Sequence, residues 1–412
     1  MKALVLAGGF PQIELIQKLR LRGIYTLLAD YYENPVAREY ADEFYQISTL
    51  DVEAIRALAK EKEVDFLITV CTDQALLTVA QVSEELGFPC YIDYQTARNV
   101  TNKAYMKKVF EENRIPTAKF LIADSLNTID ISEWKFPLIV KPVDCNSSKG
   151  VRRVENESEL ASAFQTAVEM SRTDTAIVEE YIIGKELSVD VYVESGKAHI
   201  LDITTSEKLK MKDRFVISRT WHPANISQEI EARIEQTVQQ IATAFDITDA
   251  PMLVQMLTDG KEVYVIEFSA RTGGGVKHLS IARRSGVDII GAVIDLTLGK
   301  KPVLSIREST AAFLVDEYIY CAPGLYDHIE GFEELKEKGI ITDYYVFKWQ
   351  GAIFDSLANS GDRIGGFTIE GNSKEELREK HNIVNRAVKV ISTEGKDMMR
   401  HDLLADFNFE EA

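Results

Sequence analysis

The stretch that decides the fold runs Met252-Leu-Val-Gln-Met-Leu-Thr-Asp-Gly-Lys-Glu-Val-Tyr-Val-Ile-Glu-Phe-Ser-Ala-Arg-Thr-Gly-Gly-Gly275. Two apolar runs rich in β-forming residues flank Asp259-Gly260, a dipeptide typical of a hairpin turn. The second run, Val263 to Phe268, is apolar at nearly every position, as in a strand covered on both faces. The window therefore predicts a β-hairpin whose second strand is buried.

Polar side chains end this second strand. Glu267, Ser269 and Arg271 fall on one face by the two-residue period of a strand. A carboxylate there is costly to desolvate unless a cation meets it, either Arg271 or a bound Mg²⁺. The glycines that follow let backbone N–H groups approach a ligand closely. From this window alone, a structural Glu–Arg pair beside a flexible turn explains the pattern equally well.

Bulk composition bounds the class of protein. The 412 residues suffice for two or three domains, and the excess of Asp+Glu (65) over Lys+Arg (47) gives a net charge of −18. This charge argues against nucleic acid or an anionic membrane as the main partner, although local basic pockets for phosphates are compatible with it. Four scattered cysteines without metal-ligand spacing predict reduced thiols in a cytoplasmic protein.

The first hundred residues alternate predicted strands and helices, which indicates a doubly wound parallel sheet. The strands are Ala3 to Ala7, Tyr25 to Ala29, Asp65 to Val70 and Pro89 to Ile92, and the helices are Gln12 to Leu21, Val52 to Lys62 and Gln74 to Leu86. The glycines after the first strand lack the G-x-G-x-x-G spacing of a dinucleotide site. Asp73 follows a strand end, where it is either near a ligand or an N-cap.

Several later segments suit a nucleotide. Lys103 opens a helix and Lys141 leaves an apolar strand, pinned by Pro142. Residues 146 to 151 form a small polar loop whose N–H groups and hydroxyls can cover phosphates, although the Walker A pattern is absent. The backbone from Glu180 to Ile182 can pair with an adenine edge, and Glu186 can accept from ribose hydroxyls.

In this order the segments resemble the ATP-grasp superfamily, which includes carbamoyl phosphate synthetase, biotin carboxylase and L-amino-acid ligases. The resemblance covers residues 1 to about 300. It implies ATP as the nucleotide and these nucleotide-binding residues: Lys103, Lys141, Asn146, Ser147, Ser148, Gly150, Val151, Glu179, Glu180, Tyr181, Ile182 and Glu186.

The resemblance also implies a site for Mg²⁺ or Mn²⁺ on the hairpin, with Gln255, Glu267 and Ser269 as ligands, and catalytic roles for Arg271 and Lys141. The family pattern is Glu-x-Asn-x-Arg, so serine in place of asparagine leaves open whether one metal or two are held. A strict two-residue turn would make Gln255 face away from Glu267. We therefore predict a bulge that brings both to one face.

The substrate residues follow from weaker signals. A cationic stretch from Asp202 to Ala224 includes Arg219, which either meets an anionic substrate or belongs to a solvated loop. The amides of Gly273, Gly274 and Gly275, with Lys277, would take a substrate carboxylate, although a glycine-rich turn needs no ligand to explain it.

The predicted fold class is α/β, in three parts. These are a Rossmann-like domain over residues 1–100, an ATP-grasp domain of two α+β lobes over 101–300 with a lid lobe at about 115–180, and a C-terminal α+β lobe over 301–412 that closes the cavity and forms a homodimer interface. The implied function is an ATP-dependent carboxylate–amine ligase acting through an acylphosphate on amino acids or small acids. The alternatives are a bicarbonate-activating enzyme and a nucleotide-binding protein without turnover.

Overall fold

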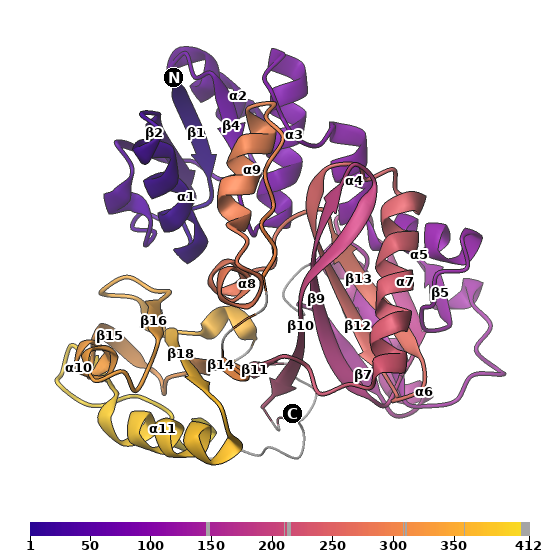
Figure 1. Cartoon of the computed structure of the whole chain (residues 1–412). Helices are drawn as coiled ribbons and strands as arrows, with labels where there is room; N and C mark the ends of the chain where they lie inside the picture. The colour runs from indigo at the N-terminus through magenta and orange to yellow at the C-terminus, as the bar shows by residue number, and fades with distance from the viewer. Residues whose placement is uncertain are drawn as a thin grey trace.

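The computed structural model describes residues 1–145, 149–209, 211, 216–307, 309, 311–357 and 359–404 (Figure 1). Over these residues the strands form four sheets. The mixed α/β architecture confirms the predicted fold class, with a parallel sheet at the N-terminus and antiparallel sheets after it. In the same part of the chain, none of the helices is long and apolar enough to cross a membrane.

The N-terminal sheet is parallel and has the strand order β3-β2-β1-β4. Apolar side chains of β1 point alternately into two cores, with Ala3 and Val5 in one and Leu4 and Leu6 in the other. The elements are β1 (Lys2–Leu6), α1 (Phe10–Leu21), β2 (Tyr25–Asp30), β3 (Glu43–Gln46), α2 (Val52–Glu61), β4 (Phe66–Ile68) and α3 (Asp73–Leu86).

Two details of this sheet differ from the sequence prediction. The predicted strand from Pro89 to Ile92 is wrong, because this short segment runs without strand pairing into the helix that Asp93 caps. Its side chains contact another part of the chain instead, since the Tyr91 hydroxyl donates to the carbonyl of Ala270 (3.1 Å). The edge strand β3 was not predicted, since its partly exposed residues lack the continuous apolar run of a buried strand.

A second sheet, the lid sheet, is antiparallel with the order β5-β8-β6-β7. Leu138 and Val140 of β6 pack against Phe164 of the covering helix in a small core of their own. The elements are β5 (Phe120–Ala123), β6 (Leu138–Pro142), β7 (Arg152–Val154), α6 (Glu157–Met170) and β8 (Ala176–Glu180).

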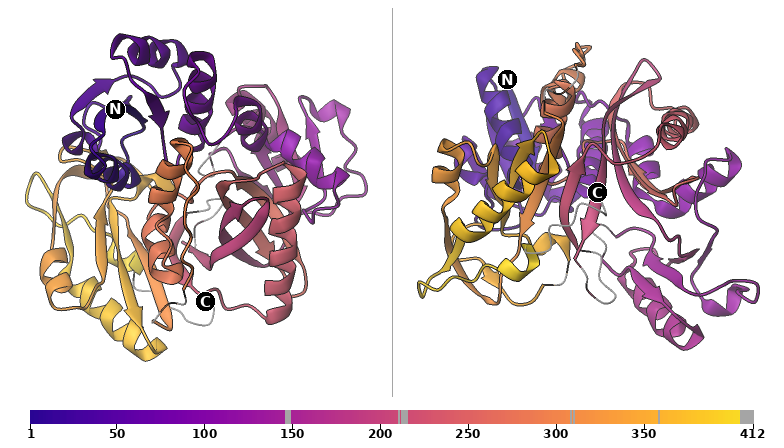
Figure 2. Two further views of the ribbon diagram at one scale, coloured as in Figure 1. Left: turned by 45° about the horizontal axis from the view of Figure 1, so that its top comes forward. Right: turned by 60° about the horizontal axis from the view of Figure 1, so that its bottom comes forward.

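The central sheet has eight antiparallel strands in the order β13-β12-β9-β10-β11-β14-β18-β16. It continues past residue 300, because β11 pairs with β14. Figures 1 and 2 show the C-terminal strands of this sheet and the lid elements β5 and α6 on opposite sides of the molecule. The strands are β9 (Lys185–Glu194), β10 (Lys197–Lys208), β11 (Ile217–His222), β12 (Ala250–Thr258), β13 (Val263–Ser269), β14 (Phe313–Ile319), β16 (Asp343–Val346) and β18 (Gly365–Gly371).

Helices and a three-stranded sheet, β17-β15-β19, complete the described chain. The helices are α4 (Tyr94–Thr101), α5 (Lys103–Glu112), α7 (Gln228–Ala244), α8 (Lys277–Ser285), α9 (Ile289–Thr297), α10 (Phe332–Glu337), α11 (Lys374–Ala387) and α12 (His401–Leu404), and the 3₁₀ turns are Arg38–Tyr40, Leu126–Thr128 and Ser360–Asp362. The small sheet's strands are β15 (Gly324–Glu330), β17 (Ile353–Phe354) and β19 (Lys389–Ser392).

The β12–β13 hairpin contains the predicted bulge. Thr258 pairs with Val263, so the connecting loop has four residues rather than two, and the register shifts between Gln255 and Met256. The shift makes Gln255 the direct partner of Glu267. Directly opposed residues of an antiparallel pair share a face, so the bulge brings both side chains to one side of the hairpin. The alternative, with Gln255 facing away, is excluded.

Candidate functional site

The expected metal ligands on the hairpin lie beside a lysine from another element. The ammonium of Lys103, at the start of α5, is 3.0 Å from a carboxylate oxygen of Glu267 and donates to the carbonyl of Cys145 (2.8 Å). Burial alone would lower the pKa of Lys103, but the charge of Glu267 outweighs it and the pKa is raised. The lysine therefore stays cationic next to the carboxylate.

Arg271 is held by a carboxylate from the start of helix α3 in the N-terminal part of the chain. Its Nε donates to one oxygen of Asp73 (2.7 Å), and a terminal nitrogen donates to the other. Burial opposes both charges, yet their attraction raises the pKa of Arg271 and lowers that of Asp73. A hydrogen bond from Ser269 also lowers the pKa of Asp73. The N-cap of α3 is Thr72, so Asp73 faces the hairpin instead of capping its helix.

Lys141 belongs to a buried cluster with Glu179 and Lys107. One oxygen of Glu179 lies 2.6 Å from the ammonium of Lys141, and the other lies 2.5 Å from that of Lys107. Burial would raise the pKa of Glu179, but the two lysines outweigh it and lower the pKa to about 2. Lys107 was not among the predicted site residues. The available signal was its place four residues after Lys103, on the same face of a helix.

Two of the three backbone N–H groups predicted to bind adenine already donate to carbonyls of the protein. The N–H of Glu180 donates to the carbonyl of Lys119 (3.0 Å), and that of Tyr181 donates to the carbonyl of Pro137 (3.4 Å). Within the described ranges, the N–H of Ile182 has no hydrogen-bond acceptor. The ring of Tyr181 lies under Arg153. Of the three predicted N–H groups, only that of Ile182 remains available to a base.

The carboxylate predicted to bind ribose is paired with a lysine. Glu186, at the start of β9, forms an ion pair with Lys208 of β10, and its side chain is 14% exposed. Of the predicted phosphate loop, Asn146, Ser147 and Ser148 lie outside the described residues. Gly150 has a φ of 73°, and a Cβ there would approach Pro142, so the end of this loop packs on the residue that follows Lys141.

Gly184 closes the predicted hinge against the hairpin. An ideal Cβ at this position would lie 2.1 Å from the carbonyl oxygen of Thr258. We expect Gly184→Ala to lower the free energy of unfolding by roughly 1–3 kcal/mol, because backbone must move to accept the methyl group. Urea denaturation measures the loss. Gly274→Ala is the matched control, since its nearest neighbouring atom is 3.8 Å away. Equal losses in both variants would contradict this expectation.

The glycine turn after β13 packs closely on a buried ion pair. A Cβ at Gly273 would lie 2.8 Å from a carboxylate oxygen of Asp190, and Gly275 has a φ of 68°. Lys277 pairs with Asp190 (3.2 Å) and donates to Thr204 (2.6 Å). The turn therefore needs glycine at two positions for packing and conformation.

Arg219, which was predicted as a substrate residue, lies away from this turn. Its guanidinium is 1% exposed and pairs with Glu317 (3.0 Å) on the strand face where His381 also lies. The neighbouring residues Thr220 and His222 point to the opposite face, toward α8. Strand alternation thus separates Arg219 from the glycine turn.

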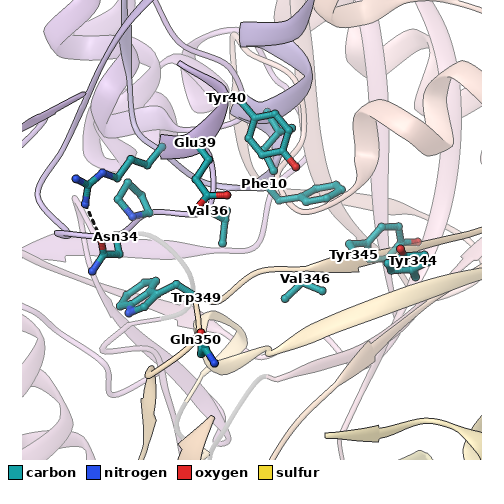
Figure 3. A pocket seen from close by; sticks show the side chains of 13 residues that line it. Phe10, Asn34, Val36, Glu39, Tyr40, Tyr344, Tyr345, Val346, Trp349 and Gln350 are labelled. Atoms are coloured by element: carbon teal, nitrogen blue, oxygen red, sulfur yellow. Dashed lines mark hydrogen bonds between the residues drawn. The ribbon is translucent and has the colours of Figure 1, made fainter. Parts of the chain in front are cut away.

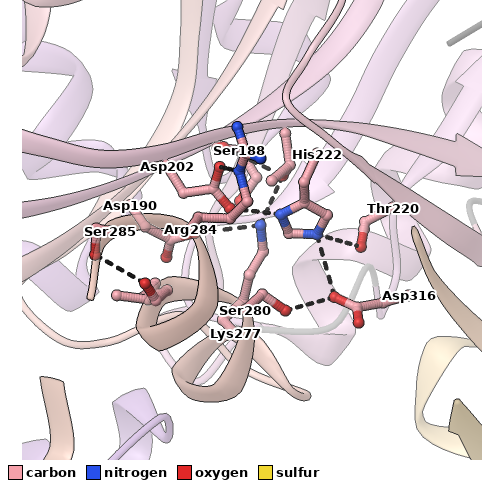
Figure 4. Close-up of polar contacts among 12 residues, drawn as sticks. Ser188, Asp190, Asp202, Thr220, His222, Lys277, Ser280, Arg284, Ser285 and Asp316 are labelled. Carbon is pink, nitrogen blue, oxygen red and sulfur yellow. Dashed lines mark hydrogen bonds and ion pairs between the residues drawn. The ribbon is translucent and has the colours of Figure 1, made fainter. Parts of the chain in front are cut away.

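Behind the turn lies a buried polar network centred on His222 (Figure 4). One ring nitrogen of His222 is 2.5 Å from Asp202 and the other is 3.1 Å from Asp316. Asp316 also accepts hydrogen bonds from Ser280 of α8 and Tyr345 of β16. The network joins four strands of the central sheet, β10, β11, β14 and β16, to helix α8.

This network predicts a pH dependence of stability. Burial would lower the pKa of His222, but Asp202 and Asp316 raise it above its ordinary value of 6.5. A raised folded pKa means that the stabilisation is complete below about pH 6.5 and is lost as the pH rises through the folded value. Urea denaturation across roughly pH 6 to 9 should show falling stability, and His222→Gln should flatten the slope. An unchanged slope in the variant would contradict the assignment.

The hairpin's donor set suits a hard divalent cation. Glu267 offers a carboxylate, Gln255 an amide oxygen and Ser269 a hydroxyl, all partly exposed. Within the described residues, no group of three or more His, Cys, Asp or Glu side chains could hold a metal alone. Mg²⁺ is usually held by one or two carboxylates together with substrate phosphates and water. The residues present therefore fit Mg²⁺ that arrives with a nucleotide.

A separate cavity of about 420 Å³ lies between α1 with residues 34–40 on one side and β16 with the segment after it on the other (Figure 3). Its walls include Phe10 and Tyr40 on one side and Tyr345 and Trp349 on the other. None of the residues predicted for nucleotide, metal or substrate lines it.

Comparison with known proteins identifies a domain family in the part of the chain that contains the hairpin. Residues 134–279 match the ATP-grasp domain family. The chain is 26% identical over 282 residues to the formate-dependent phosphoribosylglycinamide formyltransferase of Sulfurisphaera tokodaii, covering 66% of this chain and 70% of the relative.

Two solved structures share the fold over nearly the whole chain. The L-amino acid ligase of Bacillus licheniformis superposes with a TM-score of 0.78 at 21% identity, covering 95% of this chain and 98% of the other. The biotin carboxylase domain of the Hydrogenobacter thermophilus 2-oxoglutarate carboxylase, solved with MgADP and bicarbonate, has a TM-score of 0.76 at 18% identity, covering 98% of this chain and 92% of the other. The chain therefore contains an ATP-grasp domain over residues 134–279 and shares the fold of these two enzymes along nearly its whole length.

Proposed function

We propose that the protein is a carboxylate–amine ligase. The γ-phosphoryl group of ATP passes to a small carboxylate, giving an acylphosphate and ADP, and an amine then attacks the acyl carbon and expels phosphate to form an amide. The observation that carries the proposal is the hairpin bulge, which places Gln255 opposite Glu267 beside Lys103. Two relatives support this class of substrate by name, one using formate and the other joining L-amino acids.

The chain's charged residues position the phosphates and neutralise them. Lys103 and Lys141 hold the α- and β-phosphates, and the ionised Glu179 keeps Lys141 in place. The N–H of Ile182 meets the base and Glu186 meets the ribose. Arg271 stabilises the transferring phosphoryl group and the tetrahedral intermediate, where fixed charges contribute most to the rate. The Gly273–Gly275 amides and Lys277 receive the substrate carboxylate.

Glu267 and Gln255, with Ser269 at the edge of the site, would hold Mg²⁺. At these residues the cation would supply positive charge that neutralises the phosphates during transfer. The three-part division at residues 100 and 300 and a homodimer assembled through the C-terminal lobe belong to the same proposal.

A bicarbonate-activating enzyme is the second candidate, favoured by the similarity to the biotin carboxylase domain. In that case bicarbonate takes the place of the organic acid, and carboxyphosphate replaces the acylphosphate. The two candidates use the same nucleotide and metal residues and differ in the acid they activate.

The deciding experiment is phosphate release from ATP with Mg²⁺ across a panel of amino acids, formate and bicarbonate, with calorimetry of MgATP binding in parallel. A carboxylate and an amine that together stimulate release, with an amide product by mass spectrometry, support the ligase. Stimulation by bicarbonate alone supports the second candidate. Binding without release across the whole panel overturns both and leaves a nucleotide-binding protein without turnover.

A further inference from the structure

We propose that Asp73 is a positioning residue that aims Arg271 at the transferring phosphoryl group. The inference rests on the proposed function, since it concerns how that site is built. Asp73 lies in the N-terminal part of the chain, 198 residues before the arginine that it contacts. A residue of helix α3, which follows the first sheet, thereby takes part in the phosphoryl-transfer site of the central sheet.

Three of the five guanidinium donors of Arg271 are already paired. Arginine has five N–H groups in one plane. Asp73 takes the Nε–H and one N–H of a terminal nitrogen, and the carbonyl of Thr272 takes one N–H of the other terminal nitrogen (2.8 Å). One N–H on each terminal nitrogen is left without an acceptor among the described residues. This pair is the fork with which arginine grips a phosphate or a carboxylate.

Asp73 itself is held firmly by the chain that precedes it. Cys71, two residues earlier, has a φ of 60°, a left-handed conformation that is costly for a side chain with a Cβ. Gln12 donates to the carbonyl of Val70 (2.7 Å), which fixes the end of β4. The strained turn directs the start of α3 toward the hairpin, so the carboxylate meets Arg271 with a defined orientation.

The backbone next to Arg271, at the end of the hairpin, is fixed too. Tyr91 donates to the carbonyl of Ala270, next to Arg271 in the chain. The Arg271 and Asp73 side chains are only 13% and 14% exposed, so solvent does little to loosen their pair. The backbone is therefore fixed on both sides of the bidentate Asp73–Arg271 ion pair. This fixes the direction in which the two remaining N–H groups of Arg271 point.

Ser269 belongs to the same arrangement. A hydrogen bond from its hydroxyl lowers the pKa of Asp73, the residue that pairs with the arginine. The residue that replaces the family's asparagine therefore supports the anion-binding end of the site. This explains how serine is accommodated at that position.

The test compares the affinities of MgADP and of the magnesium complex of the non-hydrolysable β,γ-imido analogue of ATP, measured by calorimetry. Their ratio isolates the contribution of the γ-phosphate and needs no identified substrate. Arg271→Lys keeps the charge but loses the fork, and it should reduce the preference for the analogue by roughly ten- to hundredfold. Asp73→Asn should cause a similar reduction, with MgADP affinity unchanged, and Asp73→Glu should restore part of it.

The double variant decides whether the two residues act as one unit. If Asp73 works through Arg271, Asp73→Asn with Arg271→Lys should reduce the preference no further than Arg271→Lys alone. If Asp73 only neutralises charge, Asp73→Asn should strengthen binding of the analogue. If it is only an anchor between the two sheets, Asp73→Asn should lower thermal stability without changing the ratio. Either result overturns the proposal. No effect of Arg271→Lys would instead overturn the assignment of Arg271 in the proposed function.

Discussion

Replacing Glu267 with alanine is expected to reduce ATP-dependent phosphate release by on the order of 10³-fold. The bulge places this carboxylate opposite Gln255, where it is the acidic member of the expected metal site. Its removal also leaves the buried Lys103 without its ion-pair partner, so two charges of the site are disturbed at once. The measurement is phosphate release at saturating ATP and Mg²⁺ with the substrates that the panel identifies.

Two controls accompany this variant. Glu262→Ala removes a carboxylate from the same hairpin whose partner, Arg233, is half exposed, and it should leave turnover unchanged. Ser269→Asn introduces the family's usual residue and should also remain active. Full activity in Glu267→Ala together with loss in Ser269→Asn would remove Glu267 from the metal site.

Glu179→Ala should destabilise the protein by roughly 3–5 kcal/mol, because it leaves the buried ammonium groups of Lys107 and Lys141 without a counter-charge. Urea denaturation near neutral pH measures the loss. The pKa of Glu179, about 2, lies below its ordinary value of 4.5. The stabilisation is therefore complete above about pH 4.5 and is lost as the pH falls toward the folded value. The variant should show a weaker acid dependence over this range.

Replacing both Lys107 and Glu179 with apolar residues distinguishes the effect of charge on stability from the effect of packing. Lys107→Met combined with Glu179→Met removes both charges while keeping long side chains, and it should recover part of the stability lost in Glu179→Ala. Glu262→Ala again serves as the exposed control and should cost less than about 1 kcal/mol. A loss in Glu179→Ala no larger than in this control would contradict the buried cluster.

Local patterns predicted much of the fold and the hairpin register. Alternating strands and helices gave the parallel N-terminal sheet, and the need for Gln255 and Glu267 to share a face gave the bulge. The segment from Pro89 to Ile92 failed because a short apolar run reads the same whether it pairs in a sheet or packs its side chains elsewhere. The structure of this segment depends on tertiary contacts, which the local sequence does not show.

The site was predictable where a residue's role lies in its own segment, and less so where it depends on a distant partner. Lys103 and Lys141 stood out at the ends of their elements. The pairing of Asp73 with Arg271 joins positions 198 residues apart, and no local period connects them. Arg219 was grouped with nearby cations, yet its strand turns it to the face occupied by Glu317. Sequence proximity could not reveal which face of β11 it would occupy.

The unbroken central sheet limits how the chain can be divided. A fragment that stops near residue 300 would lose β14, and with it Glu317, the partner of Arg219, and Asp316, which contacts His222. Each of these buried groups would keep only one of its two acidic partners, and β11 would have an unpaired edge, the feature that leads to aggregation. The last third of this protein is therefore not a detachable module, and truncation at this point should abolish folding rather than yield a smaller enzyme.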